Sequence, residues 1–147
     1  MEIAVVGAQA RALCRAADVP GARPFSVLAQ ADGRAWDLLA LSADAVGAPF
    51  SGTLRARSLL LPGDSDPSLA AGAQALQIVG YGFSPRDTLT LSSFAGRERL
   101  LCLQRGLLTL GGALLEPQEL PLPEALCTLR EEDALFIAGL CLLCDPG

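Results

Sequence analysis

Two carboxylates, Asp64 and Asp66, are the side chains of this sequence best spaced for metal-ion chemistry. They follow the apolar run 58–61, which predicts a buried strand. A loop after such a strand lies at the carboxyl edge of a sheet, where α/β proteins bind ligands. Two acids there could hold a magnesium ion together with water. We favour the alternative, a helix cap in a solvated turn, because Pro67 suits the first turn of a helix.

The segment 5–12 occupies the place of a dinucleotide-binding turn, directly after a β-branched run that predicts a strand. A dinucleotide fingerprint needs glycine at its first, third and sixth positions, so that phosphates can approach the backbone closely. Those positions hold Gly7, Gln9 and Ala12, and only the first one matches. We therefore interpret the segment as a plain β–α turn.

Cys141 and Cys144 form a CxxC pair, a spacing that zinc sites and redox sites both use. A structural zinc site usually needs two more ligands, and the sequence offers neither a second pair nor a histidine. A redox pair begins a helix, where the helix dipole lowers the thiol pKa, whereas this pair ends the predicted helix 130–144. We expect both residues to pack as small apolar side chains.

Arginines alternate in two places, at Arg55 and Arg57 and again at Arg97 and Arg99. On an extended chain each pair projects to one face, which would suit an anion. A charged solvent face or a protected edge strand is the interpretation that we favour.

The sequence contains no histidine, no lysine and no asparagine, and all eleven of its basic residues are arginine. A serine nucleophile such as Ser92 or Ser93, or a cysteine nucleophile, would therefore lack histidine or lysine as its general base. We therefore lean towards a protein without enzymatic activity. A phosphate loop of the lysine-bearing kind is excluded too. The net charge of −5 argues against binding to nucleic acid or to an anionic membrane surface.

Nothing in the sequence predicts export or a membrane span. Glu2 stands where a signal peptide needs basic residues, and the apolar stretch 134–144 is well short of the roughly 20 residues that cross a bilayer. The five cysteines are an odd number, which disfavours a disulfide framework. We expect a cytoplasmic protein with reduced thiols.

The hydropathy pattern predicts a single α/β domain over 1–147, with β/α units in 1–84, antiparallel strands in 85–123 and a helix in 130–144. In the first half we expect strands at 3–6, 25–29, 36–41, 58–61 and 76–79, and helices at 8–17 and 67–75. In the second half we expect strands at 88–92, 99–104 and 107–110, a glycine turn at 111–112, and an extended edge through the prolines at 117, 121 and 123.

The predicted last helix is apolar almost all round. Its first turn carries Glu131, Glu132 and Asp133, which suit a helix N-terminus, but the residues 134–144 leave almost no polar face. Such a helix is either buried or placed at a subunit interface. We expect self-association, or a protein partner, through the helix 130–144.

The segment Leu76-Gln77-Ile78-Val79-Gly80-Tyr81-Gly82-Phe83-Ser84 resembles the late part of the central domain of the Mur ligases, the ATP-dependent amide ligases of peptidoglycan synthesis. In that family, a strand that ends in a Tyr-Gly-Phe-type turn leads into an antiparallel segment. The family's phosphate loop, modified lysine and metal-site histidines have no counterpart in this sequence. The resemblance therefore implies a bacterial relative of the fold without the ATPase machinery, and it assigns no catalytic residue and no cofactor.

The expected fold is a Rossmann-like short parallel sheet flanked by helices, with an antiparallel extension and an apolar C-terminal helix. The expected function is that of a non-catalytic cytoplasmic binding or interaction module, linked to cell-wall metabolism through the resemblance. The alternative is a domain that binds a nucleotide or a nucleotide sugar at the carboxyl edge of the sheet. The candidate ligand-binding residues are Gly7, Asp44, Asp64, Gly80, Tyr81, Gly82 and Ser84.

Overall fold

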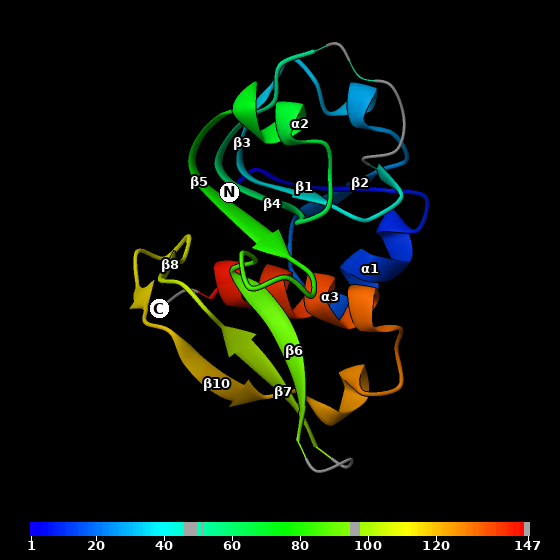
Figure 1. Ribbon diagram of the computed structural model, residues 1–147. Coiled ribbons are helices and arrows are strands. Elements are labelled where there is room, and N and C mark those ends of the chain that lie inside the picture. Colours follow the sequence, from blue (N-terminus) through cyan, green and yellow to red (C-terminus); the bar gives the residue numbers. More distant parts are fainter. Residues whose placement is uncertain (46–49, 51, 95–97, 146–147) are drawn as a thin grey trace.

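The computed structural model describes residues 1–45, 50, 52–94 and 98–145, and these residues build a sheet with helices packed on it (Figure 1). In the described part of the chain the sheet has eight strands, in the order β10-β7-β6-β5-β4-β3-β1-β2. The strands are β1 (Ile3–Val6), β2 (Ala22–Phe25), β3 (Ala35–Leu41), β4 (Arg55–Pro62), β5 (Gln74–Tyr81), β6 (Leu89–Phe94), β7 (Glu98–Leu103) and β10 (Gln118–Pro121). The helices are α1 (Ala10–Ala17), α2 (Pro67–Ala71) and α3 (Glu131–Leu143).

The first five strands of the chain run parallel to one another, and the later ones turn the sheet antiparallel. β6 still lies parallel to β5 but pairs with it only at Tyr81 and Leu89, whereas β7 and β10 are antiparallel to their neighbours. The small hairpin of β8 (Leu107–Leu108) and β9 (Leu114–Leu115) forms a separate two-stranded sheet. The predicted α/β class, with a parallel sheet, an antiparallel extension and a C-terminal helix, is confirmed.

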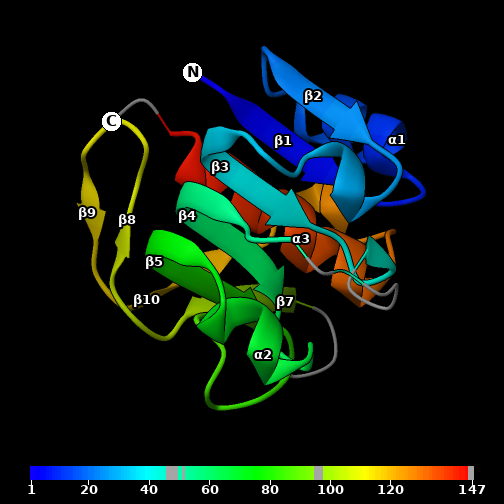
Figure 2. The same ribbon diagram turned by 90° about the horizontal axis from the view of Figure 1, so that it is seen from above.

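Two separate apolar cores lie on opposite faces of the parallel strands. Figure 2 shows α2 in front of the sheet and α1 and α3 behind it. The alternation along β3 shows the division, because Leu38 and Ala40 enter one core and Leu39 and Leu41 enter the other. Helices α1 and α3 contribute to the first core, and α2 and the turn Leu28–Gln30 pack against the second. Strands covered on both faces have near-continuous apolar sequences, which explains why these runs could be found in the sequence.

Helix α3 is covered by its own chain. It packs against α1, β4, β5 and β6, and its apolar residues from Ala134 to Leu140 are at most 5% exposed. The expectation that a second chain covers this helix therefore loses its basis, since the main surface that it leaves to solvent is Glu131, Glu132 and Cys141. The antiparallel strands supply the extra cover that the parallel strands alone would not provide.

Two local predictions are wrong. The strand expected at 25–29 is displaced to Ala22–Phe25, because Gln30 bonds the backbone amides of Ser26 and Val27 and closes a short helical turn there. Helix α2 is shorter than the predicted 67–75 and ends at Ala71, because β5 already begins at Gln74. Its cap is as predicted, with the Asp66 carboxylate accepting from Ser68 N at 3.0 Å.

Within the described residues, every helix is too short or too polar to cross a bilayer.

Candidate functional site

The loops that follow β1, β3, β4 and β5 converge at one edge of the sheet, because parallel strands all end at the same edge. β1 lies between β2 and β3, so the strand order reverses there. The link from β1 to β2 runs through α1 in the first core, and the link from β2 to β3 runs through Leu28 in the second core. A crevice at such a reversal is where open α/β sheets bind ligands.

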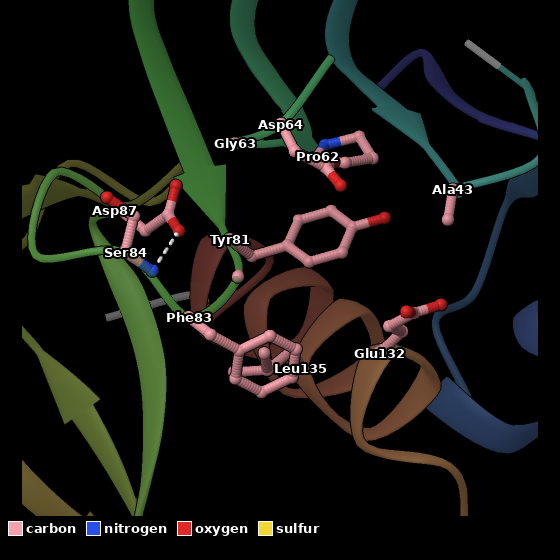
Figure 3. Close-up of a pocket in the computed structure, with 11 residues that line it drawn as sticks. Ala43, Pro62, Gly63, Asp64, Tyr81, Phe83, Ser84, Asp87, Glu132 and Leu135 are labelled. Carbon is pink, nitrogen blue, oxygen red and sulfur yellow. Dashed lines mark hydrogen bonds between the residues drawn. The ribbon is translucent and has the colours of Figure 1, made fainter. Parts of the chain in front are cut away.

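A first pocket of about 410 Å³ opens at the ends of β4 and β5 (Figure 3). The loop after β4, the turn after β5 and the first turn of α3 form its walls. In Figure 3, Asp64 from the turn after β4 and Glu132 from α3 lie on opposite sides of the Tyr81 side chain. The lining residues are Ala43, Pro62, Gly63, Asp64, Tyr81, Gly82, Phe83, Ser84, Asp87, Glu132 and Leu135.

Two further pockets adjoin the first one. The second, of about 370 Å³, lies at the ends of β1 and β3, where the strand order reverses, and shares Ala43 and Glu132 with the first. The third, of about 230 Å³, is lined by Phe83, Arg130, Glu131 and Glu132. All three pockets meet at Glu132, and together we call them the carboxyl-edge groove.

Asp44 organises the end of the groove at β1 and β3. Its carboxylate accepts from the backbone N–H of Ala8 at 2.7 Å and from the Ser42 hydroxyl. Burial raises the pKa of this carboxyl, but the hydrogen bonds from Ser42 and Ala8 outweigh burial, and Arg130 adds a smaller favourable charge. The net result is a pKa below the ordinary value for aspartate, so Asp44 is an anion at neutral pH.

Asp87 is the most buried carboxylate of the groove, and it was not predicted from the sequence. It is 5% exposed, and its carboxylate accepts from Ser84 N at 3.0 Å. A methyl group added to Gly63 or to Gly82 would overlap this carboxylate. The two glycines therefore make the room that lets a carboxylate sit below the pocket floor.

Tyr81 closes the groove from below and holds the strands together. Its ring is 3% exposed and meets Phe136 edge to face, and its hydroxyl donates to Leu41 O at 2.9 Å. Burial, followed by the nearby charges of Glu132 and Asp133, raises the pKa of the Tyr81 phenol far above its ordinary value. Tyr81 is therefore a fixed hydrogen-bond donor to the backbone and not a group that exchanges protons.

The groove carries a strongly acidic lining. Arg130 is the single basic side chain among its lining residues in the described part of the chain, and Arg130 already pairs with Asp133 at 3.4 Å. The acidic lining residues are Asp44, Asp64, Asp87, Glu131, Glu132 and Asp133. Such a lining attracts cations and hydrogen-bond donors and repels unneutralised phosphate.

The structure gathers most of the predicted site residues at this edge but gives some of them other tasks. Asp44, Asp64, Tyr81, Gly82 and Ser84 line the groove. Gly7 and Gly80 do not line it. Gly7 is buried against Ser42, where a Cβ atom would overlap the hydroxyl, and Gly80 lies within β5 beside Asp87.

The other sequence motifs lie outside the groove. Asp66 caps α2, so it does not join Asp64 in a metal site. Arg57 pairs with Asp37 at 3.7 Å, near the amino-terminal ends of the strands, while Arg97 lies outside the described residues. Over residues 1–45, 50, 52–94 and 98–145, no three His, Cys, Asp or Glu side chains are grouped so that they could hold a metal ion.

The two cysteines of the CxxC pair lie at the end of α3, where Cys144 is half-buried against the first core but Cys141 is exposed, so only Cys144 packs as expected. Cys141 Sγ donates to Ala17 O at 3.5 Å, and Cys144 follows the end of α3. Burial raises the pKa of both thiols, that of Cys144 to about 11, with a further contribution from Cys141. Both sulfurs are therefore protonated near neutral pH, which removes the thiolate that redox chemistry needs.

The lining residues that the sequence did not predict include Phe83, Asp87, Arg130 and Glu132. The charged cluster at the start of α3 was expected only as a helix-start feature, and the structure adds that Glu132 faces all three pockets. To predict that Glu132 also lines the groove, one would have to know that α3 begins at the carboxyl edge of the sheet.

Comparisons of this chain with protein-family models, with curated proteins and with solved structures found no match.

Proposed function

We propose that this chain is a non-catalytic cytoplasmic binding domain that holds a small ligand in the carboxyl-edge groove. The observation that carries the proposal is the meeting of three pockets at Glu132, at the sheet edge where the strand order reverses. This is the place where open α/β sheets bind ligands for a geometric reason, because the diverging connections leave a crevice there.

The side chains around the groove favour binding over catalysis. The buried Tyr81 phenol of the groove stays protonated. So do the thiols of Cys14, Cys141 and Cys144, which lie outside the groove and whose pKa values burial raises. The sequence offers neither histidine nor lysine as a general base. The groove instead presents fixed carboxylates and backbone groups, which can orient a ligand without reacting with it.

The acidic lining indicates the chemistry of the ligand. A molecule that offers ammonium, guanidinium or amide N–H groups would meet Asp44, Asp64 and Glu132, and an apolar part could lie against Phe83, whose side chain is 57% exposed. A nucleotide or a nucleotide sugar, the alternative from the sequence, would need a metal ion to offset the repulsion between its phosphates and these carboxylates.

A second candidate is a role in cell-wall metabolism. It is supported by the position of the segment that resembles the Mur ligases, since β5 ends at Tyr81 and the following turn leads into the antiparallel pair β6–β7. This is the arrangement that the resemblance implies for the family. Under this candidate the groove would accept a nucleotide sugar together with a divalent cation.

A thermal-shift screen separates these candidates. The compounds are spermidine, agmatine, ATP and UDP-N-acetylglucosamine, the last two with and without Mg²⁺. A ligand at 100 times its dissociation constant adds about 2.7 kcal/mol to the free energy of unfolding. We expect the two amines, spermidine and agmatine, to stabilise the protein. If instead UDP-N-acetylglucosamine together with Mg²⁺ is the one condition that stabilises it, the result would favour the cell-wall candidate.

Glu132→Gln is the diagnostic variant, because it removes one charge at the point where the pockets meet. Glu116→Gln is the matched control, since Glu116 is also exposed but does not line the groove. The shift caused by an amine should shrink in the first variant and persist in the second. A protein that none of the compounds stabilises, or an equal shift in both variants, would contradict binding in the groove.

A further inference from the structure

Strand β5 has a long open edge in the middle of the sheet. Its eight residues pair with β4 along almost their whole length, but on the other side β6 reaches only Tyr81. Among the described residues, no strand pairs with the outer edge of Gln74–Gly80. Figure 1 shows why, because β6 leaves the end of β5 and continues away from it. At about 3.3 Å per residue, this edge is roughly 23 Å long.

Exposed leucine and isoleucine side chains border this edge. Leu76 and Ile78 share one face of β5 and are 88% and 44% exposed. Leu108 and Leu114 are cross-strand partners on the outer face of the β8–β9 hairpin and are 45% and 67% exposed. The Gln77 side chain leaves the opposite face of β5, where it donates to Leu108 O and accepts from Leu108 N, so the two groups border the edge from opposite faces of the strand.

Both views of the molecule place the hairpin close to the start of β5 (Figures 1 and 2). The segments 74–84 and 107–115 contain no charged residue, although 18% of the whole chain is charged. We call the outer edge of Gln74–Gly80, with Leu76, Ile78, Leu108 and Leu114, the β5 surface. An exposed apolar surface of this kind marks an interaction site.

The other two sheet edges carry the features that prevent strand pairing, and the β5 surface does not. The edge strand β2 contains Arg23 and Pro24, and the edge strand β10 contains Glu119 and Pro121. Charges and prolines block the addition of another strand. The outer edge of Gln74–Gly80 contains neither a charged residue nor a proline, so nothing of this kind prevents another strand from pairing with it.

We propose that the β5 surface is where a second copy of this chain docks, through antiparallel pairing of the two β5 strands about a two-fold axis. Pairing centred on Gln77 places Leu76 of each copy across from Ile78 of the other, so apolar side chains meet apolar ones. One contact uses the same open edge in both copies, so the two copies close on each other as a dimer whose outer edge strands are β2 and β10.

Charge also favours a second copy at this surface. Each chain carries a net charge of −5, so two copies repel one another wherever acidic faces meet. The β5 surface has no charged side chain of its own, and it lets the two copies approach without opposing like charges. A two-fold axis perpendicular to the sheet also brings both hairpins, with Leu108 and Leu114, to one side of the joined sheet.

Sedimentation equilibrium between about 1 and 100 µM tests the proposal, a range that brackets micromolar dissociation constants. The wild type should show a reversible rise to twice the mass of one chain. Leu76→Lys places a charge in the paired edge and should weaken the dimer at least about a hundredfold. Val27→Lys is the matched control, because Val27 is 47% exposed and lies outside the β5 surface.

Hydrogen exchange gives a second readout that does not depend on mass. Backbone amides within Gln74–Gly80 should become more protected as the wild-type concentration rises, and Leu76→Lys should abolish this dependence while circular dichroism stays unchanged. A wild type that stays monomeric over the whole range would overturn the proposal. So would a dimer of equal strength in Leu76→Lys, or the loss of dimers in Val27→Lys.

Discussion

The floor of the carboxyl-edge groove depends on three glycines around the Asp87 carboxylate. Gly63, Gly80 and Gly82 lack the side chains that would otherwise occupy the space around the Asp87 carboxylate. A buried carboxylate needs hydrogen-bond donors, and Ser84 N supplies one from within the same turn. The chemistry of the pocket therefore comes as much from backbone geometry as from reactive side chains.

Asp44→Asn tests the electrostatics at the other end of the groove. Because the folded-state pKa of Asp44 lies below the unfolded value, the carboxylate stabilises the fold above about pH 3.9, and this contribution is lost as the pH falls further through the folded-state pKa. After discounting for solvent screening, the variant should be less stable by about 0.5–1 kcal/mol at neutral pH.

Urea unfolding across the pH range measures this difference. The gap between wild type and Asp44→Asn should narrow as the pH falls from about 4 towards about 2, where both proteins carry a neutral side chain at this position. A gap that stays constant over that range would show that shape, and not charge, makes Asp44 important.

At the scale of elements, α3 has two roles, one in the first core and one in the groove. Its body fills the first core, and its first turn carries the acidic residues of the groove. The near absence of a polar face, which suggested an interface, follows from contact with α1 on one side and with three strands of the sheet on the other. Such a helix is stable only as part of the packed structure.

Phe136→Ala is the test of this buried role. Removing the ring leaves a cavity beside Tyr81, and we expect the free energy of unfolding to fall by about 3–5 kcal/mol. Cys141→Ala lies on the exposed side of the same helix and should change stability by less than about 1 kcal/mol. Urea denaturation gives both values, and equal losses in the two variants would contradict the burial pattern of α3.

The elements that the sequence predicted well are those with a strong local pattern. The apolar runs of β1, β3 and β4 and the long helix α3 were expected within a few residues of their true bounds, because burial on both sides leaves a continuous apolar sequence. The strand β2 was displaced in the prediction, because an edge strand with Arg23 and Pro24 has no such pattern.

The candidate site was predicted in part for the same reason. Asp44, Asp64 and the turn after β5 follow predicted parallel strands, and the ends of such strands must meet at one edge. Asp87 and Glu132 could not be found in this way. Their places depend on the pairing of β4 with β5 and on the packing of α3, contacts between segments far apart in the sequence.

On the scale of the whole molecule, a single sheet separates two cores, and each core contains one of the chain's rare chromophores. The only tryptophan, Trp36, is 2% exposed in the second core, where Phe25 and the guanidinium of Arg34 contact its ring. The only tyrosine, Tyr81, is 3% exposed in the first core. Tyr81 therefore reports optically on the first core, and Trp36 reports on the second core.

This placement makes the cooperativity of the fold measurable without any label. Because β1, β3 and β4 contribute side chains to both cores, loss of one face should remove support from the other. Tryptophan fluorescence and tyrosine absorbance should then follow the same urea transition. Two separated transitions would instead identify the faces of the sheet as independent folding units, and the order of the two midpoints would show which face unfolds first.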